Sequence, residues 1–197
     1  MPRFSDNEKK IIRQRLLTEG DRLFTTFGLK KVSIDEIIAT TGIAKGSFYA
    51  FYPSKEHLFL DIAVSQQEKM WAEMDVFLQE HSGLSPRELV KQTVMFMFEQ
   101  FSRYPLIQSI DRDTTDYLFR KLPKEVIEAH TKDDSTELLK LEQYGVRFTC
   151  DISIAAKTLQ MLAIDFFNLA REDEATRMEI INIILDGVLK EIVRDDK

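Results

Sequence analysis

The sequence predicts an all-α fold, in which an N-terminal three-helix helix-turn-helix domain precedes a helical bundle, with about nine helices in all. Apolar residues recur at helical spacing, and no strand-like alternation competes with them. Residues that start or end helices stand between the apolar segments, as at Ser33, Gly42 and Ser54. Two late segments, 152–170 and 175–194, are apolar around most of their circumference, as buried helices are.

The segment 32–59 contains the best-marked helix boundaries. Ser33 and Glu36 form a capping box, in which each side chain satisfies a free amide of the first turn. Val32 and Ile37 occupy the flanking positions of a hydrophobic staple. Gly42 ends this helix because glycine tolerates a left-handed backbone angle. These signals predict a short helix that buries isoleucine side chains.

A second short helix begins near Lys45, and a third begins at Ser54. Serine is a good N-cap, and Pro53 disfavours a helical residue before it. At about 100° per residue, Phe48 and Tyr52 share the inner face of the middle helix. The result is a helix, a tight turn and a helix, followed directly by a third helix.

The outer face of the middle helix carries residues that suit the major groove of DNA. Gly46 and Ala50 let the helix backbone approach a partner closely, with Lys45 and Tyr49 on one flank and Ser47 and Phe51 on the other. Lysine, serine and tyrosine contact phosphates or base edges, and phenylalanine can touch a thymine methyl. Lys55 lies in the first turn of the following helix, where free backbone amides favour a phosphate, and it is a predicted phosphate anchor. The alternative is an ordinary helical hairpin whose polar residues face solvent.

The rest of the chain reads as a helical body. One helix runs from Ser54 to about Glu80, and the next starts around Pro86 and runs to near Tyr104. Two shorter helices are expected at about 106–121 and 123–143, divided by Pro123. The final helices, 152–170 and 175–194, have more apolar surface than a single core-facing stripe requires.

That excess predicts a homodimer in which the final helices also pack against their counterparts. A two-fold dimer would place two reading helices in successive major grooves. The alternative is a central helix in a monomeric bundle. The expected interface residues are Leu159, Leu162, Phe166, Ile181, Ile184, Leu185 and Val188.

Charge and composition argue against several other classes of function. The chain is acidic, but residues 1–60 hold ten Lys or Arg against seven Asp or Glu, so the head alone is basic. No apolar run predicts a membrane span or a signal peptide, and the single cysteine, Cys150, fits a reducing cytoplasm. The three histidines show no metal-ligand spacing, and no catalytic motif or cofactor motif is visible. An enzyme is therefore not expected.

From about Glu8 to Phe59 the chain resembles the DNA-binding domain of the TetR family of bacterial repressors. The resemblance rests on the following residues: Leu23-Phe24, Gly28, Ser33, the stretch Ile37–Ala39, Gly42-Ile43, Lys45-Gly46-Ser47-Phe48-Tyr49 and Ser54-Lys55-Glu56-His57-Leu58-Phe59. It implies DNA contacts by Ser33, Lys45, Ser47, Tyr49 and Lys55. It also implies a DNA-binding domain over 1–53 and an effector-binding and dimerisation domain over 54–197.

Three positions depart from the family pattern. Ala44 stands where a serine usually caps the recognition helix, which removes a cap worth about 1 kcal/mol. Phe51 stands where histidine is common. Glu19-Gly20 replaces a pair that is often alanine, so Gly20 would let the reading helices pack closer while weakening its own helix by roughly 1 kcal/mol. These departures bear on the operator sequence rather than on the class of protein.

The resemblance further implies a repressor that a small, mainly apolar or aromatic effector releases from a palindromic double-stranded DNA operator. Aromatic and methionine side chains between the head and the final helices are the candidate pocket, although such residues also form ordinary cores. The candidates are Trp71, Met97, Phe101, Tyr104, Tyr117, Phe148 and Phe166. The alternatives are a constitutive DNA-binding regulator without an effector and an all-helical protein-interaction module.

Overall fold

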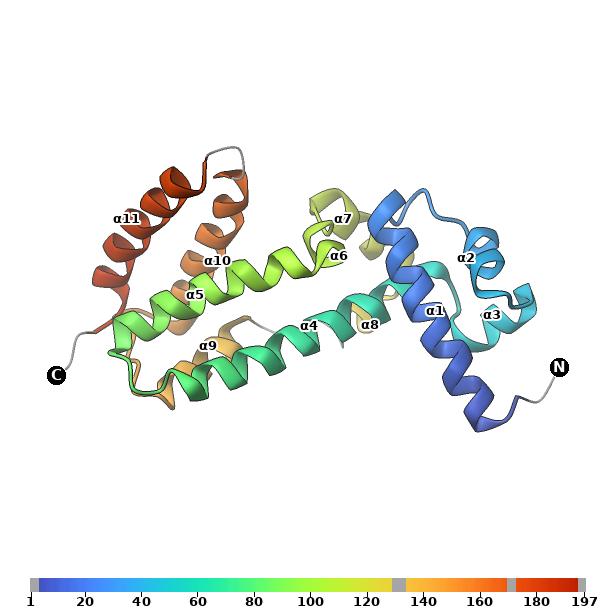
Figure 1. Ribbon diagram of the computed structural model, residues 1–197, viewed down its shortest axis with the longest axis horizontal. Helices are drawn as coiled ribbons and strands as arrows, with labels where there is room; N and C mark the ends of the chain where they lie inside the picture. Colours follow the sequence, from blue (N-terminus) through green and yellow to red (C-terminus); the bar gives the residue numbers. More distant parts are fainter. Residues whose placement is uncertain (1–3, 129–133, 170–172, 195–197) are drawn as a thin grey trace. The chain divides into compact units, whose positions relative to one another are not determined.

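The structure is a computed structural model that describes residues 4–128, 134–169 and 173–194. Within these residues it is all-α, which confirms the predicted fold class. The described residues form eleven helices, drawn in Figure 1: α1 (Asp6–Phe27), α2 (Ile34–Thr41), α3 (Lys45–Phe51), α4 (Lys55–Glu80), α5 (Pro86–Arg103), α6 (Pro105–Gln108), α7 (Arg112–Lys121), α8 (Lys124–Glu128), α9 (Asp134–Glu142), α10 (Ile152–Asn168) and α11 (Glu174–Ile192).

The expected total of about nine helices is too low for the described residues, because two predicted helices are each divided. The segment 106–121 contains α6 and α7, and the segment 123–143 contains α8 and α9. Asp111 explains the first division: its side chain accepts a hydrogen bond from the backbone N–H of Thr114 at 2.7 Å. An aspartate N-cap starts a new helix at that point. Residues 129–133, between α8 and α9, lie outside the described residues.

The chain forms two compact units. Unit 1 contains Met1–Lys69 and Arg103–Thr131, and unit 2 contains Met70–Ser102 and Lys132–Lys197. Because α4 begins in one unit and ends in the other, this packing division differs from a boundary after residue 53. The predicted assignment of DNA binding to residues 1–53, and of effector binding and dimerisation to 54–197, is a functional division and stays a prediction.

Unit 1 is built on an apolar core that α1, α2, α3 and the first part of α4 share. Phe24 of α1 and Phe59 of α4 are both buried, and their rings meet edge to face with 5.4 Å between centroids. Ile37 of α2 and Phe48 of α3 are fully buried in the same cluster. This common core fixes the two short helices, since helices of seven or eight residues are marginal without tertiary packing.

Gly20 is the point of closest approach between α1 and α4. A Cβ atom at this position would lie 3.0 Å from Cδ1 of Ile62 and 3.1 Å from Cδ2 of Leu58. The missing side chain therefore brings α1 against α4, and not against the reading helices as expected. The tight contact offsets part of the helix-propensity cost of glycine.

Unit 2 has a core of its own, formed by the second part of α4 together with α5, α9, α10 and α11. Phe77 of α4 stacks on Phe96 of α5 with 4.3 Å between ring centroids. Leu89, Ile181 and Leu185 are fully buried at its centre. Among the described residues, no helix is long and apolar enough to cross a membrane.

Candidate nucleic-acid interface

The turn between α2 and α3 follows the predicted local chemistry. Ser33 accepts a hydrogen bond from the backbone N–H of Glu36 at 3.2 Å, and the Glu36 carboxylate accepts one from the Ser33 N–H at 2.7 Å. The backbone N–H and the hydroxyl of Ser33 both donate to the Glu36 carboxylate, and these two bonds lower the pKa of Glu36 because they favour its ionised form. Gly42 ends α2 with a left-handed backbone angle, φ 69°. The capping box and the glycine stop are confirmed.

The α3 helix divides into an inner and an outer face as the sequence predicts. Phe48 is fully buried, and Tyr52, directly after the helix, is 6 % exposed. On the other side Tyr49 is 51 % exposed, and no atom approaches the place where a Gly46 side chain would stand. Lys45 and Ala50 are also exposed, so the helix presents a free backbone between two polar side chains.

Ser47 and Phe51 are less available than the rest of this face. Both are half-buried. The Phe51 ring packs against the unit 1 core and lies 6.4 Å from the ring of Phe4, measured between centroids. Much of the Phe51 ring is therefore covered by its own chain, and its predicted contact with a thymine methyl stays a prediction.

Lys45 already has an anionic partner. Its ammonium donates to the Asp35 carboxylate at 2.8 Å, and this bond raises the pKa of Lys45. Both side chains are more than half exposed, and such surface pairs contribute only about 0–1 kcal/mol. A phosphate group could therefore replace Asp35 at little cost.

Lys55 is held inside the domain. Its Nζ atom donates to the backbone carbonyls of Leu29 at 2.8 Å, Lys30 at 3.2 Å and Val32 at 2.6 Å. Burial lowers the pKa of this ammonium, although three carbonyls and nearby carboxylates stabilise its charge. The three N–H donors thus tie the α1–α2 connection to the start of α4. The predicted phosphate contact, which would need one of these donors, remains a prediction.

A further hydrogen bond, which no sequence pattern indicates, joins α4 to α7. The buried carboxylate of Glu56 accepts a hydrogen bond from the Tyr117 hydroxyl of α7 at 2.8 Å. Burial and this bond raise the pKa of Tyr117 to about 12. Burial also disfavours the Glu56 carboxylate, but its hydrogen bonds outweigh that effect and the pKa falls below its usual value. Tyr117, a candidate for the effector pocket, is thus bonded within unit 1.

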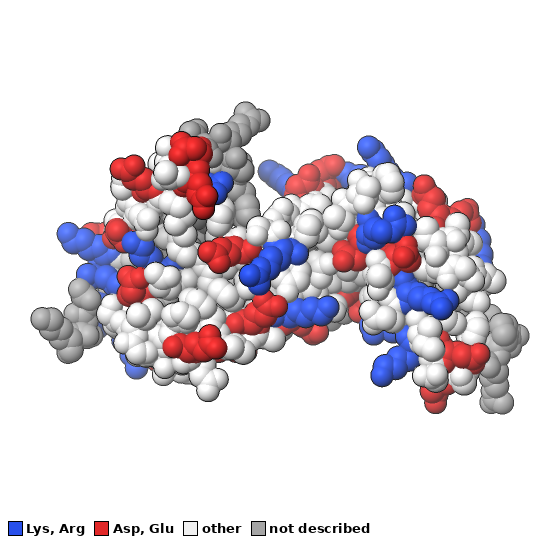
Figure 2. Space-filling model, in the orientation of Figure 1, with Lys and Arg blue, Asp and Glu red and all other residues white. Residues whose placement is uncertain are grey.

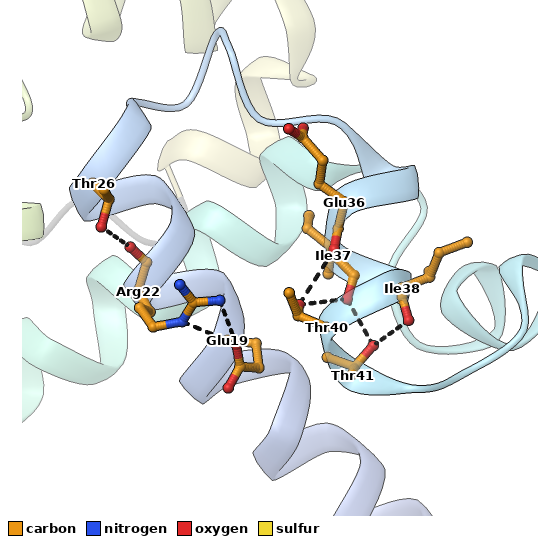
Figure 3. Close-up of polar contacts among 8 residues, drawn as sticks. All are labelled: Glu19, Arg22, Thr26, Glu36, Ile37, Ile38, Thr40 and Thr41. Carbon is orange, nitrogen blue, oxygen red and sulfur yellow. Dashed lines mark hydrogen bonds and ion pairs between the residues drawn. The ribbon is translucent and has the colours of Figure 1, made fainter.

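A hollow of about 430 Å³ lies between α1 and α2 on unit 1. Its polar groups are largely satisfied within the protein: Thr41 donates to the Ile37 carbonyl at 2.8 Å, and Glu19 pairs with Arg22 at 2.9 Å (Figure 3). None of the candidate effector residues lines this hollow.

On the face drawn in Figure 2, basic and acidic side chains are interspersed over both units. Total charge therefore says little about where DNA would bind.

The remaining candidates for the effector pocket lie in separate places. Trp71, Met97 and Phe148 are half-buried against the unit 2 core. Phe101 is also half-buried and lies in unit 2, whereas Tyr104 belongs to unit 1. The side chain of Phe166, predicted for both the pocket and the dimer interface, lies outside the described residues.

A short helix with a buried inner face and an open outer face, set behind a tight turn, defines the class of helix-turn-helix DNA-binding domains. Comparison with known proteins agrees. Residues 16–62 match the family model described as bacterial regulatory proteins, tetR family. An uncharacterised HTH-type transcriptional regulator of Bacillus subtilis (strain 168), YerO, is 30 % identical over 121 residues, which are 61 % of this chain and 37 % of that relative's length.

Solved structures show the same fold over nearly the whole chain. A putative TetR-family regulator from Syntrophomonas wolfei has a TM-score of 0.64 at 19 % identity, covering 91 % of this chain and 93 % of its own. RolR, solved in complex with its ligand resorcinol, has a TM-score of 0.58 at 19 % identity, covering 93 % of this chain and 90 % of its own. The matched segment 16–62 and the shared fold make this chain similar to TetR-family transcriptional regulators.

Replacing Lys55 with methionine should lower the free energy of unfolding by about 1–3 kcal/mol, because three backbone carbonyls lose their donor. Denaturant unfolding of the two proteins measures the difference. Lys31→Met is the matched control, since Lys31 is exposed in the same connection. Equal stability of the Lys55 and Lys31 variants would show that the carbonyl contacts contribute nothing.

Proposed function

We propose that the protein is a homodimeric transcriptional regulator that binds a two-fold symmetric DNA operator through α2 and α3 and is released from it by a small molecule. The outer face of α3 is the observation that carries this proposal. Gly46 and Ala50 leave its centre free of bulky side chains, and Lys45 and Tyr49 flank it in exposed positions. This combination allows the helix backbone to enter a major groove while its flanks contact phosphates.

The dimer proposal rests on exposed apolar residues of α10 and α11. Ile154 and Met161, seven residues apart on one side of α10, are 53 % and 66 % exposed, and Ile183 of α11 is 66 % exposed. Scattered apolar residues are normal on a surface, but several large ones on two consecutive helices favour a contact surface. A second copy of the chain is the partner that a palindromic operator requires.

The predicted interface residues divide by burial. Leu159, Ile181 and Leu185 are nearly or fully buried within unit 2, so they support the helices from inside and offer little surface to a partner. Leu162 and Val188 are half-buried, and Ile184 is 36 % exposed. The proposed interface therefore moves toward the outer sides of both helices. Ile154, Met161, Ile183 and Ile184 form its apolar part.

Two buried polar atoms support an effector site in unit 2. Among the described residues, neither Nε1 of Trp71 nor Oε1 of Gln100 has a hydrogen-bond partner. An unpaired buried polar group is costly, and a ligand that offers an acceptor and a donor would remove that cost. Since the structural relative RolR was solved in complex with resorcinol, a small aromatic molecule with polar substituents is the proposed effector class.

Replacing Lys45 and Tyr49 together with alanine should abolish operator binding and leave the dimer intact, because both side chains are exposed on α3. The operator is first selected from random DNA with the wild-type protein. Affinities of the wild type and of Lys45→Ala alone are then measured over a range of salt, and the lost lysine–phosphate contact should make the salt dependence shallower by about one unit. Lys69→Ala, an exposed lysine of α4, is the control. Unchanged binding by the double variant would remove α3 from the interface.

Replacing Ile183 with arginine should convert the dimer to monomers, because a charge would enter an apolar contact. Sedimentation analysis measures the oligomeric state. Val76→Arg is the control, since Val76 of α4 is 55 % exposed and lies outside the proposed interface. A monomeric wild-type protein, or a dimeric Ile183 variant, would contradict the proposed surface.

The effector proposal predicts that a dihydroxybenzene such as resorcinol, tested with related phenols, changes the fluorescence of Trp71 and weakens operator binding. Trp71 is the only tryptophan in the chain, so the signal reports one place. Gln100→Leu should reduce the affinity for the phenol about tenfold and leave DNA affinity unchanged. If no phenol alters fluorescence or operator binding, the constitutive alternative is favoured.

A further inference from the structure

The Asp61 carboxylate of α4 joins three parts of unit 1. It accepts a hydrogen bond from the Tyr52 hydroxyl at 2.5 Å, through Oδ2. It also accepts two from the Arg13 guanidinium of α1, at 2.7 Å to Oδ2 and 3.0 Å to Oδ1. Tyr52 is the residue that ends α3. One side chain of α4 thus holds both α1 and the end of the recognition helix.

The recognition helix depends on such external contacts because it has little stability of its own. It is seven residues long, its N-cap Ala44 makes no side-chain hydrogen bond, and neither end carries a charge that favours the helix dipole. Its position is set by Phe48 and Tyr52, the two aromatic residues that it directs inward. The buried Phe48 ring sets how closely the helix packs against the core. Of the contacts made by these two side chains, only the hydrogen bond of the Tyr52 hydroxyl is directional.

The two partners of Asp61 contribute unequally to the stability of this arrangement. The Arg13 and Asp61 side chains are 54 % and 30 % exposed, and ion pairs of that kind contribute about 0–1 kcal/mol. The Tyr52 hydroxyl belongs to a residue that is 6 % exposed, and its acceptor is an ionised carboxylate. Hydrogen bonds to charged groups are shorter and stronger than neutral ones. Burial and the Asp61 contact also raise the pKa of Tyr52, so its hydroxyl stays a donor.

Tyr52 is linked to the outer face of α3 through adjacent rings. Its ring lies 6.2 Å from that of Phe48, and the Phe48 ring meets that of Tyr49 edge to face at 5.6 Å, measured between centroids. A rotation of the Tyr52 ring would therefore displace Phe48, which fills the core, and with it the exposed Tyr49. The hydroxyl–carboxylate bond opposes that rotation at the C-terminal end of the helix.

We propose that Asp61 is a positioning residue for DNA reading, which acts through the Tyr52 hydroxyl to fix the rotation of α3 against α1 and α4. This inference rests on the proposed function. Contacts to phosphates tolerate small rotations of a helix, whereas hydrogen bonds to base edges need defined geometry. The Tyr52–Asp61 bond should therefore affect affinity for the operator much more than affinity for unrelated DNA.

The test compares Tyr52→Phe and Asp61→Ala with the wild-type full chain on two duplexes of equal length, the selected operator and an unrelated sequence. Each single variant should lose about tenfold in operator affinity and less than twofold on unrelated DNA. The double variant should lose no more than Asp61→Ala alone, because both changes break the same bond. Asp61→Glu should restore part of the operator affinity.

Tyr117→Phe is the matched control. It removes a tyrosine hydroxyl that donates to another α4 carboxylate, Glu56, in the same unit and at a similar distance. Its operator affinity should stay within threefold of wild type. Operator affinity within twofold of wild type for both Tyr52→Phe and Asp61→Ala would overturn the proposal. An equal loss on both duplexes would also overturn it, since that result indicates less folded protein.

Hydrogen exchange without DNA separates this inference from the proposed function. In Tyr52→Phe the amides of α3 should exchange faster than in wild type, while those of α10 stay unchanged. Faster exchange in a protein that prefers no DNA sequence would confirm the structural link and refute the DNA-reading role. Unchanged exchange at α3, together with normal operator preference in the wild type, would refute the positioning role alone.

Discussion

The burial of Phe48 and Tyr52 is the constraint on which the recognition surface depends. Seven residues do not make a stable helix in water, so α3 exists because its inner face fills the core that α1, α2 and α4 share. The same burial determines what faces outward. Once Phe48 points inward, helical geometry places Gly46 and Ala50 on the outer side, with Lys45 and Tyr49 beside them. Stability and recognition are therefore set by the same few side chains.

Several charged side chains that a sequence count assigns to DNA binding have structural partners instead. Lys55 donates to three carbonyls, and Lys30 pairs with Asp113 of α7. Lys45 has an exposed partner in Asp35, which a phosphate can replace cheaply. The excess of basic residues in the head therefore overstates the number of phosphate contacts. Affinity for DNA should come from a few groups around α3.

Much of this fold could be predicted from signals between residues close together in the sequence. Contacts between residues far apart in the sequence could not be predicted in this way. The capping box of Ser33, the left-handed Gly42 and the inward Phe48 follow from neighbours within a few residues, and the structure has all three. The partners of Lys55 and Asp61 lie 23–26 and 9–48 residues away, so no spacing rule reveals them. Periodicity marked α10 and α11 as unusually apolar, but it could not tell that Leu159 and Ile181 serve the chain's own core.

Within unit 1, the side chains that would set affinity for DNA differ from those that would set the preference for one DNA sequence. Lys45 and Tyr49 sit on the flank of α3 and would act on phosphates, whose charge is the same in every sequence. Reading of base edges would depend on how α3 is rotated, and the contacts proposed to fix this rotation, Phe48 and the Tyr52–Asp61 bond, lie on its hidden side. Changes on α4 can therefore alter which sequence is preferred without touching DNA. Asp61 lies in the part of α4 that belongs to unit 1, so the proposed control of sequence preference would be built into the head itself.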